Sequence, residues 1–440
     1  MKHLSIWTLF IILPALLATA DLARASKIYI DIDSPGFRQF PIAVSDFTQK
    51  ADRQAKTADL SVALPEQIRK LLGITGLFNP LDKNSFLDES GVSLPESIRF
   101  SDWTAIGADY LLTGLITTVS PQETACEIRL YDVVRGSTLL YKRYISKTPD
   151  LRALARATTT DILLTLTGDA GDFNTRIAFV SKNGSEADIH TISYDGEDTA
   201  RLTRHQSIIA APRWSPDGRY LAFTSYQSGR PAVYLRNLKT GQERIVSSSQ
   251  GLNLSGGFSP DSRKLLMTLS RDSNEEIYVL DLDTMRLKRL TYNYAIDVSP
   301  AWSPAGEKIA FVSNRSGTPQ IFVMDADGNN VRRITYEGNY NTSPAWSPRG
   351  GKIAFEGLIN RRFQIFTVDT EGENLTQLTF DDANNEYPSW SPSGRQIVYG
   401  SRTGAKTRLC IINSNGLHTR VLQEGNGVSV MPSWSPRMTP

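Results

Sequence analysis

The second half of this chain repeats one short signal at an interval of 44 residues. The signal is an aromatic residue followed by Ser-Pro, and its aromatic residues are Trp214, Phe258, Trp302, Trp346, Trp390 and Trp434. Apolar strand openers keep the same phase, at Leu221, Leu265, Ile309, Ile353 and Ile397 and again at Val233, Ile277, Ile321, Ile365 and Leu409. A repeat of this length, made of short β-branched runs and turn residues, is typical of a β-propeller with four-stranded blades.

The two ends of the repeat array predict the number of blades. Ile177 and Ile189 keep the strand phase one repeat before the first signal, but no Trp-Ser-Pro precedes them. The signal at Trp434 has no strands after it. We therefore expect one blade to be shared, with its first strand from the C-terminal segment and the other three from residues 175–205. This predicts a six-bladed propeller closed by N- and C-terminal strands, which leaves no free sheet edge.

The turns of the repeat predict structure and not metal binding. Asp325-Ala326-Asp327-Gly328 superficially resembles the start of a calcium loop, but the following residues lack the spaced Asp and final Glu of an EF-hand. The repeat phase explains this stretch as a hairpin. The histidines, His3, His190, His205 and His418, are scattered along the chain. We predict no metal site, no cofactor and no catalytic residue.

Residues 1–25 have the pattern of a secretory signal peptide. A short basic start precedes an apolar run over residues 4–17, and Ala23-Arg24-Ala25 predicts cleavage between Ala25 and Ser26. Cleavage after Ala20 is the weaker alternative. The apolar run is short for a membrane span, and no cysteine near the cleavage site offers a lipid anchor. We expect an exported protein without membrane insertion.

Residues 26–167 predict a separate α/β (α+β) domain, followed by a linker over residues 168–174 and the propeller over residues 175–440. Strands are expected at residues 27–33, 41–44, 110–118, 126–133 and 139–145, and helices at residues 64–72 and 150–166. Thr148-Pro149-Asp150 resembles a helix start with proline in the first helical position. This is an ordinary size for one domain.

Composition excludes several classes of partner. Cleavage would remove Lys2, Arg24 and Asp21 and leave 46 basic and 45 acidic side chains, a net charge of +1. A chain this close to neutral is a poor match for nucleic acid or an anionic membrane. Cys126 and Cys410 lack redox or metal spacing, and we favour two unpaired buried thiols, although export would permit a bridge.

Three features together carry a family resemblance. They are the start of the mature chain at residues 27–31 leading to Pro-Ile-Ala-Val at 41–44, the stretch Gly-Ala-Asp-Tyr-Leu-Leu-Thr-Gly at 107–114, and six blades of the Trp-Ser-Pro-Asp-Gly type. On these features the whole chain resembles the TolB family, the periplasmic component of the Tol-Pal envelope system of Gram-negative bacteria. The resemblance implies a monomeric, non-enzymatic adaptor that supports outer-membrane integrity and constriction during cell division. It implies two partners, the lipoprotein Pal and the inner-membrane protein TolA, with other envelope proteins as further candidates.

An enzyme is the alternative. Propellers of this repeat type also precede hydrolase domains in peptidases, where the nucleophile lies in Gly-x-Ser-x-Gly. The nearest string in this chain, residues 251–257, has Asn253 where the first glycine belongs. A propeller lyase would need clustered acid and base residues at the channel mouth, and the mouth loops contain few. We therefore predict that the chain is not an enzyme.

The start of the mature chain is the predicted TolA contact, given the resemblance. Isoleucines alternate with Tyr and Asp, as in a strand that can add to the sheet edge of a partner. From the pattern alone, the first strand of its own domain is the simpler interpretation. The predicted contact residues are Ser26, Lys27, Ile28, Tyr29, Ile30, Asp31, Ile32 and Asp33.

The predicted Pal site is one mouth of the propeller channel. The residues five positions before each repeat aromatic are mostly polar, and we expect them to form a neutral hydrogen-bonding collar around this mouth. An ordinary loop role is the simpler interpretation for any single member. The collar positions are Ile209, Asn253, Asp297, Asn341, Asn385 and Ser429, and the predicted site adds Arg204, His205, Asn339 and Glu386.

Overall fold

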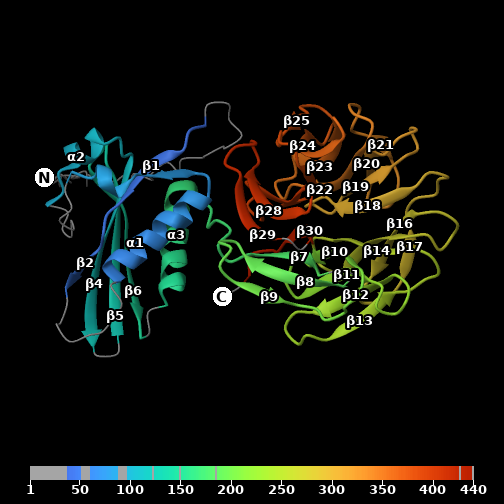
Figure 1. Ribbon diagram of the computed structural model, residues 1–440, viewed down its shortest axis with the longest axis horizontal. Coiled ribbons are helices and arrows are strands. Elements are labelled where there is room, and N and C mark those ends of the chain that lie inside the picture. Colours follow the sequence, from blue (N-terminus) through green and yellow to red (C-terminus); the bar gives the residue numbers. More distant parts are fainter. Residues whose placement is uncertain are drawn as a thin grey trace, which may run out of the picture.

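The computed structural model describes residues 37–50, 60–87, 97–120, 123–147, 150–183, 186–425 and 428–438. These residues form two bodies side by side, an α/β body at the left and a ring of blades at the right of Figure 1. The predicted signal peptide and the predicted strand at residues 27–33 lie outside the described residues. Within the described part, no helix is long and apolar enough to cross a membrane.

The α/β body is one mixed sheet with two long helices packed on it (Figure 1). Its strand order is β3-β1-β4-β5-β6, with β2 beside β4. The strands are β1 (Phe40–Val44), β2 (Thr48–Lys50), β3 (Phe78–Pro80), β4 (Tyr110–Ser120), β5 (Glu123–Asp132) and β6 (Ser137–Ser146), and the helices are α1 (Leu60–Ile74), η1 (Lys83–Ser85), α2 (Phe100–Ala105) and α3 (Leu151–Thr167). Leu64, Ile68 and Leu72 of α1 repeat every four residues, and all three are fully buried because they form one face of the helix.

Helix α3 begins later than the sequence pattern predicts. Asp150 is its N-cap, and the carboxylate accepts hydrogen bonds from the backbone N–H groups of Arg152 and Ala153. The expectation of proline in the first helical position was therefore wrong. An aspartate oxygen satisfies two of the free N–H groups at a helix start, which makes Asp150 the stronger start signal. Gly168 ends the helix with φ of 74°.

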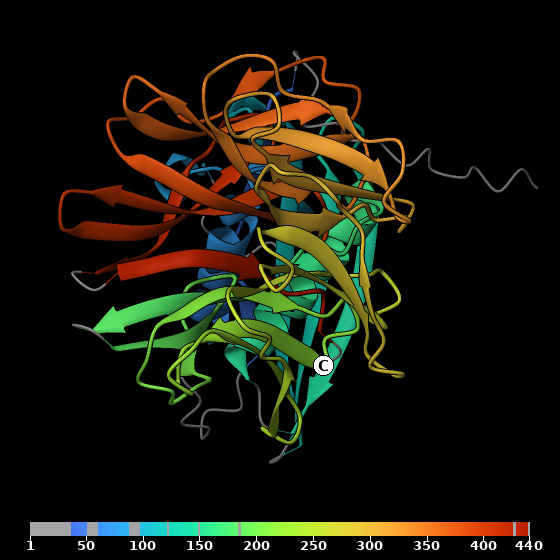
Figure 2. The same ribbon diagram turned by 90° about the vertical axis from the view of Figure 1, so that its right-hand side faces the viewer.

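The propeller has six four-stranded sheets, and Figure 2 shows the blades fanned around the ring. Five of the blades run outward from their innermost strand in sequence order. The first blade consists of β10 (Ile209–Trp214), β11 (Tyr220–Ser225), β12 (Ala232–Asn237) and β13 (Glu243–Ser247). The second consists of β14 (Asn253–Phe258), β15 (Lys264–Leu269), β16 (Glu276–Asp281) and β17 (Leu287–Arg289). The third consists of β18 (Asp297–Trp302), β19 (Lys308–Ser313), β20 (Gln320–Asp325) and β21 (Arg332–Arg333). The next two are β22 (Asn341–Trp346), β23 (Lys352–Ile359), β24 (Arg362–Asp369) and β25 (Thr376–Gln377), then β26 (Asn384–Trp390), β27 (Gln396–Thr403), β28 (Lys406–Asn413) and β29 (Arg420–Gly425).

The sixth blade is shared between the two ends of the propeller, as predicted. Its strand order is β30-β7-β8-β9, from β30 (Val428–Trp434), β7 (Arg176–Asn183), β8 (Glu186–Ser193) and β9 (Thr199–Arg201). Strand β30 pairs antiparallel with β7, and Trp434 lies opposite Ile177. The C-terminal strand therefore holds the ring closed by the hydrogen bonds of one sheet. The predicted six-bladed architecture with a preceding α/β domain is confirmed.

A bulge interrupts every innermost strand just before its repeat aromatic. The pairing register shifts there in all six blades. In five blades the residue three positions before the aromatic has a positive φ of 50–58°, at Ala211, Ser299, Ser343, Tyr387 and Met431. A bulge leaves one residue unpaired and turns its side chain away from the regular alternation. The bulge residues are therefore available to line the channel.

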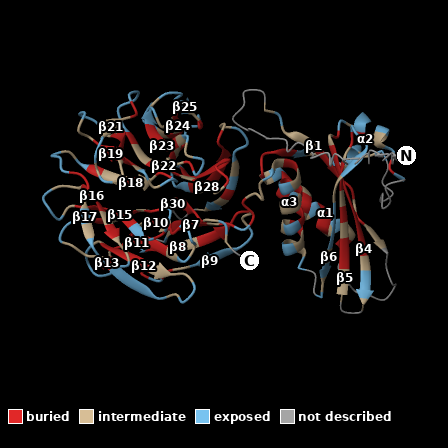
Figure 3. Ribbon diagram, turned by 180° about the vertical axis from the view of Figure 1, so that it is seen from behind, coloured by how far each residue is buried: buried red, intermediate tan, exposed pale blue. Residues whose placement is uncertain are grey.

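The buried residues follow the strands of every blade and the inner face of the α/β body (Figure 3). One continuous apolar cluster crosses between the two bodies, from Ile68 and Leu72 of α1 to Tyr194 and Trp434 of the propeller. The two bodies therefore share part of one core. Cys126 and Cys410 are buried free thiols, as expected, and burial raises their pKa values to about 12 and about 11.

Candidate partner-binding site

The collar positions are placed at the start of each innermost strand, around the channel opening that we call the collar mouth. Their side chains, however, do not form an open ring. Asn253, Asp297, Asn341 and Asn385 are all buried within their blades, and Ile209 is buried too. The expectation of a solvent-facing hydrogen-bonding collar was therefore wrong. The side chain of Ser429 lies outside the described residues.

Hydrogen bonds within each blade explain why the collar amides turn inward. The amide nitrogen of Asn253 donates to the carbonyls of Ser249 and Gly251. That of Asn341 donates to Gln320 Oε1 and to the carbonyl of Glu337. Asn253 and Asn341 thus satisfy carbonyls of the loops that lead into their strands, because a buried loop carbonyl without a donor is costly, whereas Asn385 donates to the side chains of Gln364 and Asp381. The charged member, Asp297, pairs with Arg315 at 2.7 Å between Oδ2 and Nη2.

The other predicted site residues lie in different environments. Arg204 and Asn339 are exposed on loops at the collar mouth, and Glu386 is half-buried in the channel wall. His205 is buried between Ser225 and Glu243, at 2.8 Å and 2.7 Å from its two ring nitrogens. It therefore holds its blade together and is not available at the surface. The predicted TolA contact residues 26–33 lie outside the described residues.

The channel wall at the collar mouth comes from the bulges. A cavity of about 390 Å³ opens here, and all six residues three positions before the repeat aromatics line it. These are Ala211, Ser255, Ser299, Ser343, Tyr387 and Met431. Four of the six side chains are small, so the opening stays wide. Leu254, Thr342 and Glu386, one position earlier, line the same cavity.

Glu356 is a buried carboxyl group in this wall. It accepts hydrogen bonds from Ser343 Oγ at 3.0 Å and from the backbone N–H of Tyr387. Burial raises its pKa to about 7, and the nearby Glu386 adds to the rise. Burial also raises the pKa of Glu386, and the guanidinium of Arg402, 3.9 Å from its carboxylate, partly offsets this rise. The collar mouth therefore carries two carboxyl groups whose pKa values are raised by burial.

Exposed aromatic side chains lie on three neighbouring loops, each of which leads from the outermost strand of one blade to the innermost strand of the next. Tyr292, Tyr336 and Phe380 occupy the same repeat phase in three neighbouring loops and are 75%, 68% and 77% exposed. The guanidinium groups of Arg289 and Arg333 lie 4.6 Å and 5.0 Å from the two tyrosine rings. The same phase holds Arg204, Ser248 and Glu424 in the other loops. Large exposed aromatics are characteristic of protein-binding surfaces, and here they lie on three of the loops on the collar side of the ring.

Family comparisons agree with this architecture. Residues 28–139 match the family model "TolB amino-terminal domain", and residues 164–438 match "TolB beta propeller domain". The second match alone covers more than half of the chain. The chain belongs to the TolB family.

Relatives in the TolB family support the assignment. A Tol-Pal system protein TolB from Syntrophus aciditrophicus is 47% identical over 228 residues, 50% of each chain. One from Desulfosudis oleivorans is 36% identical over 259 residues, 58% of this chain and 56% of the relative. The chain thus spans about half the length of the curated relatives it matches. The crystal structure of TolB from Acinetobacter baumannii matches over 91% of this chain and 97% of its own, with a TM-score of 0.80 and 29% identity.

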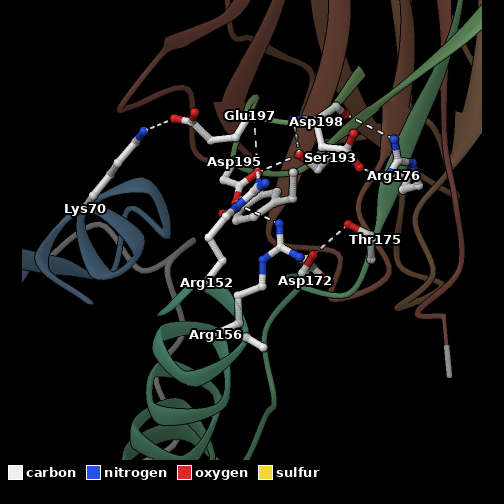
Figure 4. Close-up of polar contacts among 12 residues, drawn as sticks. Lys70, Arg152, Arg156, Asp172, Thr175, Arg176, Ser193, Asp195, Glu197 and Asp198 are labelled. Atoms are coloured by element: carbon white, nitrogen blue, oxygen red, sulfur yellow. Dashed lines mark hydrogen bonds and ion pairs between the residues drawn. The ribbon is translucent and has the colours of Figure 1, made fainter. Parts of the chain in front are cut away.

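An ionic contact around one buried carboxylate joins the two TolB-family domains (Figure 4). Arg152 and Arg156 of α3 reach the carboxylate of Asp195, in the turn after β8, at 3.1 Å and 2.8 Å. Burial alone would raise the pKa of Asp195, but hydrogen bonds from Ser193, Arg156 and Arg152 outweigh it and hold the pKa well below its usual range. Lys70 of α1 contacts Glu197 beside it. We call this contact the interdomain joint.

Sequence reasoning missed the channel residues and the interdomain joint. The sequence did contain a signal for Glu356: it is a charged residue at a repeat position that holds Thr, Val or Gly in the other blades. The recurrence of an aromatic residue at the repeat position of Tyr292, Tyr336 and Phe380 could likewise be recognised in the sequence. Asp195 carried no comparable signal, because it lies in an ordinary turn and its partners come from another domain.

Proposed function

We propose that this chain is a non-enzymatic, periplasmic adaptor of the Tol-Pal system. The proposal rests on one observation above all, namely that both of its domains match TolB domains and that the fold matches a TolB crystal structure over almost the whole chain. The adaptor binds Pal at the collar mouth and TolA through the segment that follows signal cleavage. It supports outer-membrane integrity and constriction during division. We also propose residues 26–167 and 175–440 as its two domains and residues 168–174 as the linker.

The features of the collar mouth support it as the Pal site. Its cavity is open, and the loops that lead into the innermost strands on this side of the ring carry three exposed aromatics together with Arg204 and Asn339. Exposed aromatics with a guanidinium behind the ring offer a partner a large contact area and little side-chain entropy to lose. Buried collar amides such as Asn253 act indirectly in this arrangement, because they hold the shape of the loops that bear the contact residues.

The Pal site can be tested with substitutions that leave the buried amides intact. Leu254→Arg and Thr342→Arg place a long charged side chain into the collar mouth from half-buried positions. We expect each to weaken Pal binding by about tenfold or more in calorimetry, since each blocks the opening and leaves a charge to desolvate. Ala305→Arg, at an exposed turn on the opposite side of the ring, is the matched control. Unchanged Pal affinity in both collar variants, or a loss in the control alone, would place the site elsewhere.

The TolA contact is tested by deletion of residues 26–33 from the mature chain. The deletion should abolish TolA binding in a pull-down and leave the melting temperature and Pal affinity unchanged, because the segment precedes the sheet of the α/β domain. A control variant keeps the length of this segment but replaces its isoleucines with serine, so that an effect of the side chains can be distinguished from an effect of the length. Unaltered TolA capture after the deletion would refute the assignment.

A further inference from the structure

The opposite opening of the channel is a second cavity, which adjoins the collar-mouth cavity inside the ring. It measures about 430 Å³, and we call it the Trp-Pro mouth after its lining. The repeat aromatics Trp214, Phe258, Trp302, Trp346, Trp390 and Trp434 line it, together with the repeat prolines Pro216, Pro260, Pro304, Pro348, Pro392 and Pro436. Six blades thus contribute the same two apolar groups to one wall. The volume lies in the range of pockets that hold small organic ligands.

Among the residues that the structure describes, Arg213 is the only charged one in the lining of this cavity. It occupies the position just before a repeat aromatic, and the same phase holds Gly257, Ala301, Ala345, Ser389 and Ser433 in the other blades. Five small side chains therefore surround one long cationic one. Arg213 also lines the collar-mouth cavity, so its side chain lies where the two cavities adjoin.

In the described part of the chain, no carboxylate pairs with the guanidinium of Arg213. Its Nη1 donates to the carbonyl of Pro212 at 3.0 Å, and none of its nitrogens forms an ion pair within the described residues. A guanidinium stays protonated and carries five N–H donors, so most of its donors remain free for a ligand. By contrast, the arginines of the interdomain joint and of the collar each face a carboxylate, as Arg315 faces Asp297. An unpaired charge beside apolar walls favours binding of an anion, because fixed apolar surroundings weaken the interaction less than water does.

The shape and charge of the Trp-Pro mouth together favour one chemical class of ligand. We propose that the Trp-Pro mouth binds an organic monocarboxylate, with the carboxylate on Arg213 and an apolar body against the tryptophans and prolines. A planar guanidinium matches a carboxylate through two parallel hydrogen bonds. A single cation among apolar walls suits one negative charge better than a phosphate, and it disfavours cationic ligands. Two sources share this chemistry, a free small acid and the C-terminal carboxylate of a polypeptide that ends in an apolar residue.

The proposal is tested by titrating the mature chain with 2-naphthoate and with its neutral analogue 2-naphthamide. Calorimetry and tryptophan fluorescence both report binding, because five tryptophans line the cavity. We expect the acid to bind at least about tenfold more tightly than the amide, as a charged hydrogen-bond pair requires. Arg213→Met should reduce acid binding to the level of the amide, and Arg213→Lys should retain part of the preference. Arg219→Met, an exposed arginine of the same blade outside the cavity, should behave like the wild type.

A second pair of probes distinguishes the sources. A tetrapeptide that ends in phenylalanine is compared as the free acid and as the C-terminal amide. Preference for 2-naphthoate alone assigns a small acid, and preference for the peptide acid alone assigns a chain terminus. Both outcomes support the site.

An Arg213→Met variant that fails to fold would be recognised by its melting temperature. We expect this temperature to be equal to or above that of the wild type, because the substitution removes an unpaired charge. Equal acid affinity in Arg213→Met and the wild type overturns the proposal. So does the absence of any preference for acid over amide with both probes. Neither result depends on Pal or TolA, so this site and the proposed adaptor function fail separately.

Discussion

At the residue scale, equivalent repeat positions have acquired different surroundings. Trp302 and Trp390 occupy the same phase, but only the indole of Trp390 is paired, through Nε1 and the carbonyl of Ala345 at 3.0 Å. The Nε1 of Trp302 is buried and has no acceptor among the described residues. The aromatic ring therefore matters at every blade, whereas the indole N–H matters only at some.

This difference predicts the outcome of two matched substitutions. Trp390→Phe removes the donor of a hydrogen bond, whereas Trp302→Phe removes a donor that has no acceptor. We expect Trp390→Phe to cost about 1 kcal/mol more in free energy of unfolding. Urea denaturation of both variants measures this. Equal costs, or a larger cost for Trp302→Phe, would contradict the assigned hydrogen bonding.

Glu356 makes stability depend on pH. Burial raises its pKa in the folded protein to about 7, above the value of an exposed glutamate. A group with a raised pKa contributes stability that is fully present below about pH 4.5 and is lost as the pH rises through about 7. Glu356→Gln should therefore raise the free energy of unfolding above pH 7, by at most roughly 3 kcal/mol, and have little effect at pH 4.5. Thermal melts across this range test it.

The exposed Glu373 provides the control for this measurement. Glu373→Gln should shift the melting temperature equally little at every pH, because its carboxylate is solvated in both states. If the Glu356→Gln variant follows the pH profile of the wild type, the buried carboxyl group is not the source of the dependence.

At the scale of elements, the interdomain joint connects α3 to the turn after β8. The side chain of Asp195 is only 7% exposed and faces two arginines of the helix. The same interface continues through Tyr194, whose hydroxyl donates to the carbonyl of Ile74 at 2.9 Å. Charged, polar and apolar contacts thus fix one orientation of the two domains.

Loss of the Asp195 charge should loosen the interdomain joint. Asp195→Asn leaves Arg152 and Arg156 without their counter-charge, but both guanidinium groups are partly exposed to solvent. We therefore expect the free energy of unfolding to fall by about 1–3 kcal/mol, the cost of hydrogen bonds lost at charged groups. We expect faster proteolysis in residues 168–174 and a lower melting temperature of the α/β domain. Asp283→Asn is the control, because Asp283 and its partner Arg263 are both more than half exposed. Identical proteolysis of both variants would show that apolar contacts alone hold the domains.

At the scale of the whole molecule, the C-terminal strand closes the ring and supports the neighbouring domain. Strand β30 pairs with β7, and Nε1 of Trp434 donates to Thr175 Oγ1 at 2.8 Å, close to the linker. Trp434 also belongs to the apolar cluster shared by the two domains. One strand therefore closes the ring and also contributes to the docking of the two domains.

Removal of residues 428–440 should abolish cooperative unfolding. The truncation exposes the edge of β7 and opens the shared core, so we expect a broad thermal transition and binding of a hydrophobic dye. Addition of a peptide with the sequence of residues 428–440 should restore a sharp transition, which controls for nonspecific damage. A truncated chain that melts as sharply as the full chain would show that closure is dispensable.

The sequence by itself determined the six blades, their phase and the shared sixth blade. The constant spacing of the strand signals leaves only one arrangement in which every blade is buried. Turn residues such as Pro216 and Gly218 determine the backbone only at their own positions, so the sequence is enough to place the turns. The α/β domain was predicted less fully. Strands β2 and β3 are too short for a periodic signal, and the start of α3 depended on a side-chain cap.

Only the tertiary structure decided where the side chains of the candidate site point. The collar amides, such as Asn253, were expected at the channel, but the bulge after them turns them into the blade and directs residues such as Tyr387 into the channel instead. Asp195 and Arg156 are 39 residues apart and belong to different domains, so no local pattern connects them. Among the described residues, Arg213 likewise lacks an ion-pair partner because of the side chains that all six blades place around the channel, which no local pattern shows. Local periodicity specifies strands, whereas burial and pairing across the ring belong to the assembled fold.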